Sequence, residues 1–142
     1  MSDMGCLIST KGRYALRVMI DLAGNGQGSY VPLKEMAERQ DISLKYLESI
    51  MPNLIRSGLV SASQGRGGGY ALSRPAEEYS IGEILKAAEG DLIPVACLAD
   101  GYVCPRADSC RTLPVWKKLD RIIGDYLDQV PLSELLMEEE II

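Results

Sequence analysis

The chain has 142 residues, of which 46% are hydrophobic and 25% are charged, and its net charge is −5. These fractions are ordinary for a single soluble globular domain and exclude a disordered or collagen-like chain. The sequence contains no histidine, which removes the commonest general base, and no nucleophile stands in a recognisable pattern with a base. We therefore do not expect an enzyme.

The apolar runs of the sequence are much shorter than the ~20 residues that a membrane-spanning helix needs. The N-terminus shows no basic segment followed by an apolar one, so no secretory signal is visible. We expect a cytoplasmic protein without a membrane partner.

Charge is divided unevenly between the two halves of the chain. Residues 1–75 carry nine Lys or Arg and six Asp or Glu, a net charge of +3, whereas residues 76–142 carry six and fourteen, a net charge of −8. A basic first half suits contact with nucleic acid, and an acidic second half would steer the protein so that only the basic half meets it. The alternative is chance variation, because an excess of three positive charges is small.

Three short helices are predicted in the first half. The first begins near Lys11, with Ser9 or Thr10 as its cap, and ends before residues 24–26. The second runs over residues 33–40. The third is capped by Ser43, is interrupted and kinked by Pro52, and ends at Gly58. Its predicted apolar stripe consists of Tyr46, Leu47, Ile50, Leu54 and Ile55.

A β-hairpin is predicted after these helices, because two short apolar runs at 59–62 and 70–72 flank the glycine-rich residues 63–69. Three helices followed by a hairpin are the order of a winged helix-turn-helix, in which the hairpin is the wing. The run also contains Arg66 among its glycines, but it lacks the spacing and the Lys-Ser/Thr pair of a nucleotide-binding loop. A plain tight hairpin is the alternative.

The second half is predicted to contain a helix at 81–88 capped by Ser80, a long loop at 92–112 without clear periodicity, and a long amphipathic helix at 113–130. Pro131 ends that helix, residues 132–137 add a short one, and Glu138 to Glu140 form a solvated tail. The fold class is therefore mainly α with a small β-hairpin wing. We divide the chain into a DNA-binding domain at 7–75, a linking helix and loop at 76–112, and a dimerisation helix with a short C-terminal helix at 113–137.

The candidate DNA contacts lie at the start of the first helix, at the start of the third helix and on the wing. In the third helix Leu44 and Leu47 are expected to face inward and the polar residues outward. The hydroxyls of serine and threonine and the ammonium of lysine can donate hydrogen bonds to phosphates or base edges. A glutamate can accept a hydrogen bond from the N4 amino group of cytosine. An ordinary solvated helix face would have a similar composition. The candidates are Thr10, Lys11, Arg13, Ser43, Lys45, Tyr46, Glu48, Ser49, Gln64 and Arg66.

Three cysteines fall in the loop between the last two long helices. Cys97, Cys104 and Cys110 are separated by six and then five residues. Three thiols from one loop suit a metal ion or an iron–sulfur cluster. Zinc, a disulfide and three inert thiols are the alternatives, although no secretory signal indicates an oxidising compartment.

Several segments resemble the Rrf2 family of bacterial winged-helix regulators, and the likeness extends from about Leu7 to Leu136. The segments that carry it are 8–16, 42–48, 57–60, 65–70 and 79–84. The resemblance implies a homodimer whose long C-terminal helix packs against its twin. It also implies binding to a palindromic promoter site in double-stranded DNA, usually as a repressor.

Within the family, the three-cysteine loop is similar to that of members that bind an iron–sulfur cluster or sense nitric oxide. By that resemblance Cys97, Cys104 and Cys110 hold a [2Fe–2S] or [4Fe–4S] cluster, which senses iron–sulfur status, nitric oxide or redox state. A family member that represses cysteine metabolism lacks these cysteines and is a poorer match. One alternative is a cofactor-free or zinc-binding repressor that senses redox state through its thiols. A second alternative is a winged helix that binds another protein as an adaptor and does not bind DNA.

The fourth ligand of such a cluster departs from the family pattern. Leu113 stands where the cluster regulators have a histidine, and Arg13 aligns with the carboxylate that the nitric-oxide sensors use; neither side chain can serve. Cys6 is the first candidate for the fourth ligand. Asp100, Asp108 and an exogenous thiol are the others.

Overall fold

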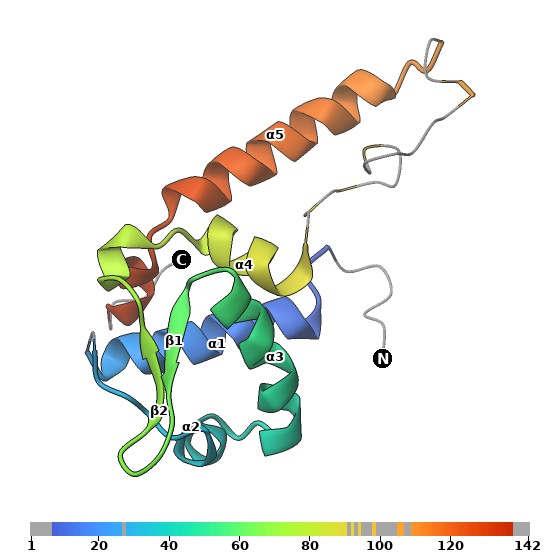
Figure 1. The fold of residues 1–142 in the computed structure, drawn as a ribbon. Coiled ribbons are helices and arrows are strands. Elements are labelled where there is room, and N and C mark those ends of the chain that lie inside the picture. Colours follow the sequence, from blue (N-terminus) through green and yellow to red (C-terminus); the bar gives the residue numbers. More distant parts are fainter. Residues whose placement is uncertain are drawn as a thin grey trace.

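The structure is a computed structural model, and it describes residues 7–26, 28–90, 92, 94, 98, 105–106 and 109–137. Five α-helices and one two-stranded antiparallel hairpin make up most of these residues, with one short 3-10 helix between the hairpin and α4 and another after α5 (Figure 1). The elements in chain order are α1 (Thr10–Gly24), α2 (Leu33–Gln40), α3 (Leu44–Arg56), β1 (Val60–Ser63), β2 (Gly69–Leu72), η1 (Ala76–Glu78), α4 (Ile81–Glu89), α5 (Leu113–Gln129) and η3 (Leu132–Leu136). The predicted mainly α fold with a hairpin wing is therefore confirmed.

The hydrophobic core lies between α1, α3, α4 and the base of the hairpin. In α1 the predicted apolar face is buried, because its residues recur at the helical repeat. These residues are Ala15, Val18, Met19 and Leu22. The last 3-10 helix contributes Leu132, whose side chain is also fully buried.

The buried face of α3 differs from the prediction. It consists of Leu47, Ile50, Met51 and Leu54, whereas Ile55 is 40% exposed and Leu44 is 41% exposed. Ile55 lies about 100° around the helix from Leu54, which turns it away from the core. Leu44 lies one turn before the buried stripe begins. The inward orientation expected for Leu44 and Ile55 is therefore wrong. Met51, which is not among the predicted core residues, is buried instead.

The helix α3 is continuous through Pro52, so the predicted interruption at that residue is wrong. Pro52 is exposed, so its ring faces away from the core. Proline has no N–H, which removes the hydrogen bond that residue 52 would donate to the carbonyl of Glu48. The cost of that loss is small where water reaches the carbonyl.

The wing pairs β1 with β2 and gains a third extended segment that the sequence did not reveal. Val31 forms an antiparallel bridge with Tyr70, with N–O distances of 2.8 and 2.9 Å for the two hydrogen bonds. Gly69 has a φ of +150°, and a β-carbon there would collide with the carbonyl of Val31. Only glycine therefore lets the segment between α1 and α2 approach the hairpin this closely.

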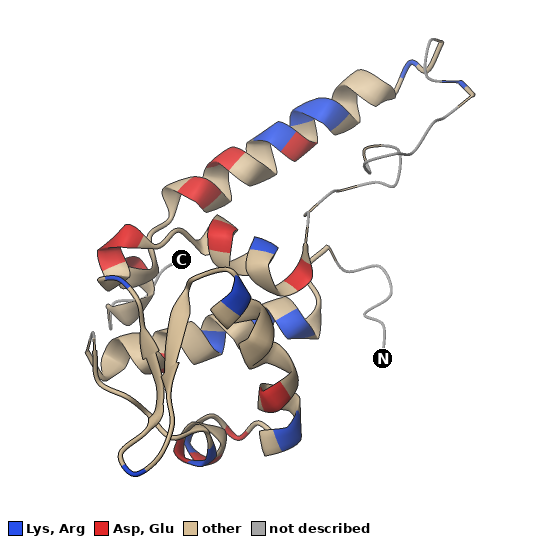
Figure 2. Ribbon diagram, viewed as in Figure 1, with Lys and Arg blue, Asp and Glu red and all other residues tan. Residues whose placement is uncertain are grey.

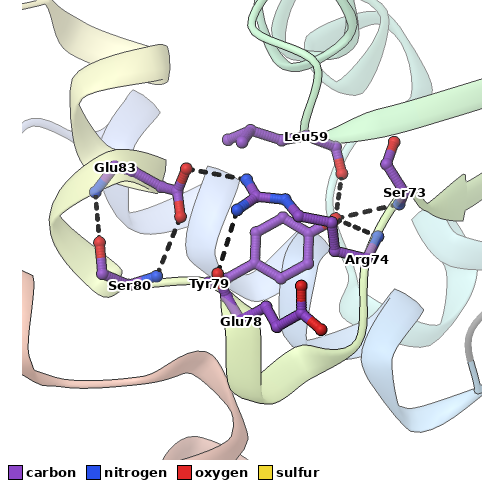
Figure 3. A network of polar contacts seen from close by, with 7 residues as sticks. All are labelled: Leu59, Ser73, Arg74, Glu78, Tyr79, Ser80 and Glu83. Atoms are coloured by element: carbon purple, nitrogen blue, oxygen red, sulfur yellow. Dashed lines mark hydrogen bonds and ion pairs between the residues drawn. The ribbon is translucent and has the colours of Figure 1, made fainter.

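A buried tyrosine joins the base of the wing to α4 (Figure 3). The hydroxyl of Tyr79 donates to the carbonyl of Leu59 at 2.5 Å and accepts from the backbone N–H groups of Ser73 and Arg74 at 3.0 and 3.1 Å. The guanidinium of Arg74 lies 4.3 Å from the centroid of the Tyr79 ring. Arg74 also pairs with Glu83 of α4 at 2.8 Å, so the ring lies within a network that spans both elements.

The start of α4 is held by a capping box and by the chain that follows α5. Ser80 and Glu83 exchange side-chain and backbone hydrogen bonds, which confirms the predicted cap. The Ile81 N–H then donates to the carbonyl of Val130 at 2.8 Å, and the Leu132 N–H donates to the carbonyl of Tyr79 at 2.9 Å. The C-terminal end of α5 is thereby fastened to α4, while its N-terminal half projects beyond the rest of the fold (Figure 1).

Among the described residues, no helix is both long enough and apolar enough to cross a bilayer.

We predict that Tyr79→Phe lowers the free energy of unfolding by about 1–3 kcal/mol, because it leaves a buried carbonyl and two N–H groups without their shared partner. Urea denaturation at one fixed protein concentration measures the change. Tyr30→Phe is the matched control, because Tyr30 is 41% exposed and the same atom is removed. Equal denaturation midpoints for both variants and the wild type would contradict the role assigned to the hydroxyl.

Candidate nucleic-acid interface

The first two turns of α3 present a polar surface. Ser43 occupies the N-cap and its hydroxyl accepts from the Tyr46 N–H at 3.1 Å, as predicted for a capping residue. The Ser49 hydroxyl donates to the carbonyl of Tyr46 at 2.6 Å. Ser43, Lys45, Glu48 and Ser49 are all exposed. The predicted outward-facing residues of this helix are therefore placed on its surface.

Tyr46 differs from these residues, because its ring is half-buried and packs against α1. The rings of Tyr46 and Tyr14 meet edge to face, with centroids 5.3 Å apart. The guanidinium of Arg17 lies 5.2 Å from the Tyr14 ring centroid and donates to the backbone carbonyl and side chain of Gln40. These contacts join α1, the end of α2 and the start of α3.

A buried carboxylate holds α2 against α1. The side chain of Asp21 accepts from Arg39 at 2.7 and 3.1 Å and from Gln40 at 2.9 Å, and only 2% of it is exposed. Burial acts to raise the pKa of Asp21, but the hydrogen bonds from Arg39 and Gln40 and the charge of Arg39 outweigh it and hold the pKa below its ordinary value. Sequence reasoning did not identify this contact. Its signal was an aspartate three residues after Val18, on the apolar face of the first helix.

Ser9, one of the two residues predicted to cap α1, occupies its N-cap position. Its side chain forms no capping hydrogen bond. Its backbone N–H instead donates to the carboxylate of Glu89, the last residue of α4, at 2.8 Å. The other oxygen of that carboxylate is buried without a hydrogen-bond partner and lies over Gly12, where a β-carbon would collide with it. Glycine at this position therefore lets α4 approach the first turn of α1.

Three candidate residues lie in that first turn. Arg13 is exposed and donates to the hydroxyl of Thr10 at 3.0 Å. Thr10 and Lys11 are partly exposed. The first turns of α1 and α3 contain no acidic residue, whereas those of α2 and α4 contain Glu35 and Glu83. The start of α1 already holds the Glu89 carboxylate, so only the positive end of the α3 dipole favours an external anion by this argument.

The wing tip carries the remaining candidates. Gln64 and Arg66 are exposed, and Gly65 and Gly67 on either side of Arg66 have φ angles of +88° and +77°. Among the residues that the structure describes, no carboxylate pairs with Arg66. Figure 1 shows the tip of the wing and the start of α3 at the same end of the molecule, and Figure 2 shows acidic residues on η1 and along the C-terminal half of α5.

Only one of the predicted metal ligands lies among the described residues. The Cys110 sulfur lies 3.3 Å from the hydroxyl oxygen of Thr112, the N-cap of α5. That hydroxyl, together with the backbone N–H groups of Thr112 and Leu113 and the charge of Arg106, lowers the pKa of the Cys110 thiol. The other candidates, Cys6, Cys97, Cys104, Asp100 and Asp108, lie outside the described residues. Within the described part of the chain, no three His, Cys, Asp or Glu side chains form a group that could hold a metal ion.

Residues 8–138 match the Rrf2 family, described as iron-dependent transcriptional regulators. The chain belongs to the Rrf2 family. The match covers nearly the whole chain and includes α1, α3 and the wing. The Rrf2 chain is therefore a transcriptional regulator of the DNA-binding type rather than an enzyme, which confirms both expectations from the sequence.

Curated relatives of this Rrf2 chain include the HTH-type transcriptional regulator IscR from two bacteria. The protein of Klebsiella pneumoniae strain 342 is 37% identical over 135 residues, which cover 95% of this chain and 82% of the relative. The protein of Escherichia coli O1:K1 is 38% identical over 136 residues, which cover 95% and 83%.

Solved structures give the same fold. CymR, the global cysteine regulator of B. subtilis, is 32% identical with a TM-score of 0.75, and the match covers 94% of this chain and 98% of that one. IscR of T. potens is 33% identical with a TM-score of 0.71, and the match covers 95% and 89%. The Rrf2 chain is thus similar to both a regulator of the IscR type and one of the CymR type.

Proposed function

We propose that this Rrf2-family chain works as a homodimer that binds promoter DNA and represses transcription. We further propose that an iron–sulfur cluster controls the binding. In this proposal residues 7–75 bind DNA, residues 76–112 carry the cluster, and residues 113–137 form the dimer. The observation that carries the proposal is the exposed polar start of α3, which lies at the same end of the molecule as the wing tip and has no acidic residue in its first turn.

The DNA-binding part of the proposal assigns a role to each exposed side chain. The start of α3 enters the major groove, where Lys45 reaches a phosphate or guanine and Glu48 accepts from cytosine. Arg66 lies at the tip of a glycine-built hairpin, which lets the backbone approach the adjacent phosphates or the minor groove closely. Tyr46 contributes mainly through its contact with Tyr14, which orients α3 on α1.

The dimer is proposed from the apolar surface of α5. Val115, Leu119, Ile122 and Tyr126 recur at i, i+4, i+7 and i+11 and are between 38% and 63% exposed. This stripe is separate from the side of the helix that holds Leu127, which packs against the core. A continuous exposed stripe on a projecting helix is typical of a helix that packs on a second copy. Such a pair sets the distance between two α3 helices, which must lie ~34 Å apart to enter successive major grooves.

The cluster is proposed on Cys97, Cys104 and Cys110. The environment of Cys110 fits a thiolate ligand, because Thr112 and the first N–H groups of α5 stabilise the deprotonated sulfur. A bound cluster would neutralise three thiolates and join them into one unit. Cys110 lies two residues before the N-cap of α5, and Glu89 at the end of α4 accepts from the start of α1. The segment proposed to hold the cluster therefore connects α4, which contacts α1, to the proposed dimer helix.

A second candidate is a regulator that senses oxidants through its thiols, without a cluster. The lowered pKa of Cys110 favours it, because a thiolate is the form that oxidants attack. The fold is also similar to that of CymR of Staphylococcus aureus, whose oxidised form has been solved. That chain is 33% identical to this one, and the TM-score is 0.70.

We expect Arg66→Gln to weaken binding to promoter DNA of every sequence by a similar factor, because a phosphate contact carries no sequence information. The slope of log affinity against log salt should fall by about one. Fluorescence anisotropy over a range of salt concentrations measures both effects. Lys118→Gln removes the same charge from exposed α5 and should leave the slope unchanged. An unchanged slope in Arg66→Gln would remove the wing tip from the interface.

We expect Ile122→Asp to convert the dimer into a monomer, because it places a charge in the middle of the apolar stripe. Sedimentation velocity at several protein concentrations reports the change. Gln129→Asp adds the same charge to an exposed polar position on the same helix and should remain dimeric. If Ile122→Asp and the wild type sediment alike, α5 does not form the interface.

We expect the protein purified without oxygen to absorb visible light and to contain iron and sulfide, and Cys104→Ala to lose both. The amounts of iron and sulfide per chain distinguish a [2Fe–2S] from a [4Fe–4S] cluster. DNA affinity at fixed salt, with and without the cluster, then tests whether the cluster controls binding. A colourless protein free of iron after anaerobic reconstitution would favour the thiol regulator, and equal affinities of the two forms would refute cluster control.

A further inference from the structure

Leu44 is an exposed leucine at the first position of the proposed recognition helix. Its side chain is 41% exposed, and the polar residues on either side, Ser43 and Lys45, are exposed as well. Leu16 and Leu33 are more buried than Leu44 and pack against the hydrophobic core. An apolar side chain therefore stands within an otherwise polar surface and contributes little to the core.

The direction of this side chain follows from its place in the helix. Side chains in an α-helix lean toward the N-terminus, so the first residue projects beyond the start of α3. Recognition helices use their N-terminal residues to contact base edges in the major groove. In that groove the four base pairs present hydrogen-bonding atoms and one apolar group, the 5-methyl group of thymine.

We propose that Leu44 is a specificity-determining residue that contacts the 5-methyl group of a thymine in each half of the operator. The proposal rests on the proposed DNA-binding function and deepens it. Ser43, Lys45 and Glu48 supply hydrogen bonds to phosphates and polar base edges, whereas Leu44 adds an apolar contact that cytosine and the purines do not offer. A homodimer places this contact symmetrically, so the thymines should occupy equivalent positions in the two half-sites.

The test uses duplexes that the wild-type protein selects from a random DNA library. Each thymine of a selected duplex is replaced in turn by deoxyuridine, which removes only the methyl group, and affinity is measured by fluorescence anisotropy at fixed salt. We expect one symmetry-related pair of thymines to respond, with affinity falling about fourfold per half-site, the value for one buried methyl or methylene group.

Two protein variants complete the test. Leu44→Ala should bind the thymine duplex about fourfold more weakly per half-site and should no longer distinguish thymine from deoxyuridine at the responding position. Ile55→Ala is the matched control, because Ile55 is 40% exposed on the same helix but lies about 16 Å further along its axis. It should retain both the affinity and the discrimination.

The outcomes separate this inference from the proposed function. Selection of no duplex at all would overturn DNA binding and the role of Leu44 together. Specific binding in which no thymine responds, or in which Leu44→Ala still discriminates deoxyuridine from thymine, would overturn the role of Leu44 alone. Because deoxyuridine leaves the protein unchanged, this part of the test does not depend on how any variant folds.

Discussion

The buried hydroxyl of Tyr79 is the contact on which the arrangement of the domain depends. It satisfies a carbonyl at the base of β1 and two N–H groups after β2, while its ring lies beneath Arg74, which reaches Glu83 of α4 (Figure 3). A buried polar group is stable only where its partners are supplied. One hydroxyl supplies three of them, so the wing cannot change its angle to α4 without leaving polar groups unpaired.

The proposed DNA-binding surface is built on two further buried or half-buried contacts. Asp21 holds α2 to α1 through Arg39 and Gln40, and the Tyr14 ring holds α1 to α3 through Tyr46. The side chains that face solvent on α3 and the wing make few contacts of their own. The buried contacts that stabilise α3 and the exposed residues proposed to contact DNA therefore lie on opposite sides of that helix.

Two sets of exposed apolar residues differ in their surroundings. Those of α5 form a continuous stripe on a projecting helix, which suits a second copy of the chain. Leu44 stands alone among polar side chains, which suits a small apolar group within a polar groove. Glu89 is the last residue of α4 and accepts a hydrogen bond from the start of α1. In the proposed function the segment that contains the cysteines begins just after Glu89, so it is joined directly to the C-terminal end of α4.

The sequence by itself determined the elements and their order, because apolar spacing, Ser43, Ser80 and the glycine-rich tip act within a few residues of chain. It also placed the polar face of α3, and family resemblance supplied the assignment that the comparisons confirm. Tertiary structure decided which apolar residues of α3 are buried. Met51 and Leu54 lie in the core, whereas Leu44 and Ile55 are exposed. It alone paired Asp21 with Arg39, Tyr79 with Leu59 and Glu89 with Ser9, because these partners are 18, 20 and 80 residues apart and no local pattern links them.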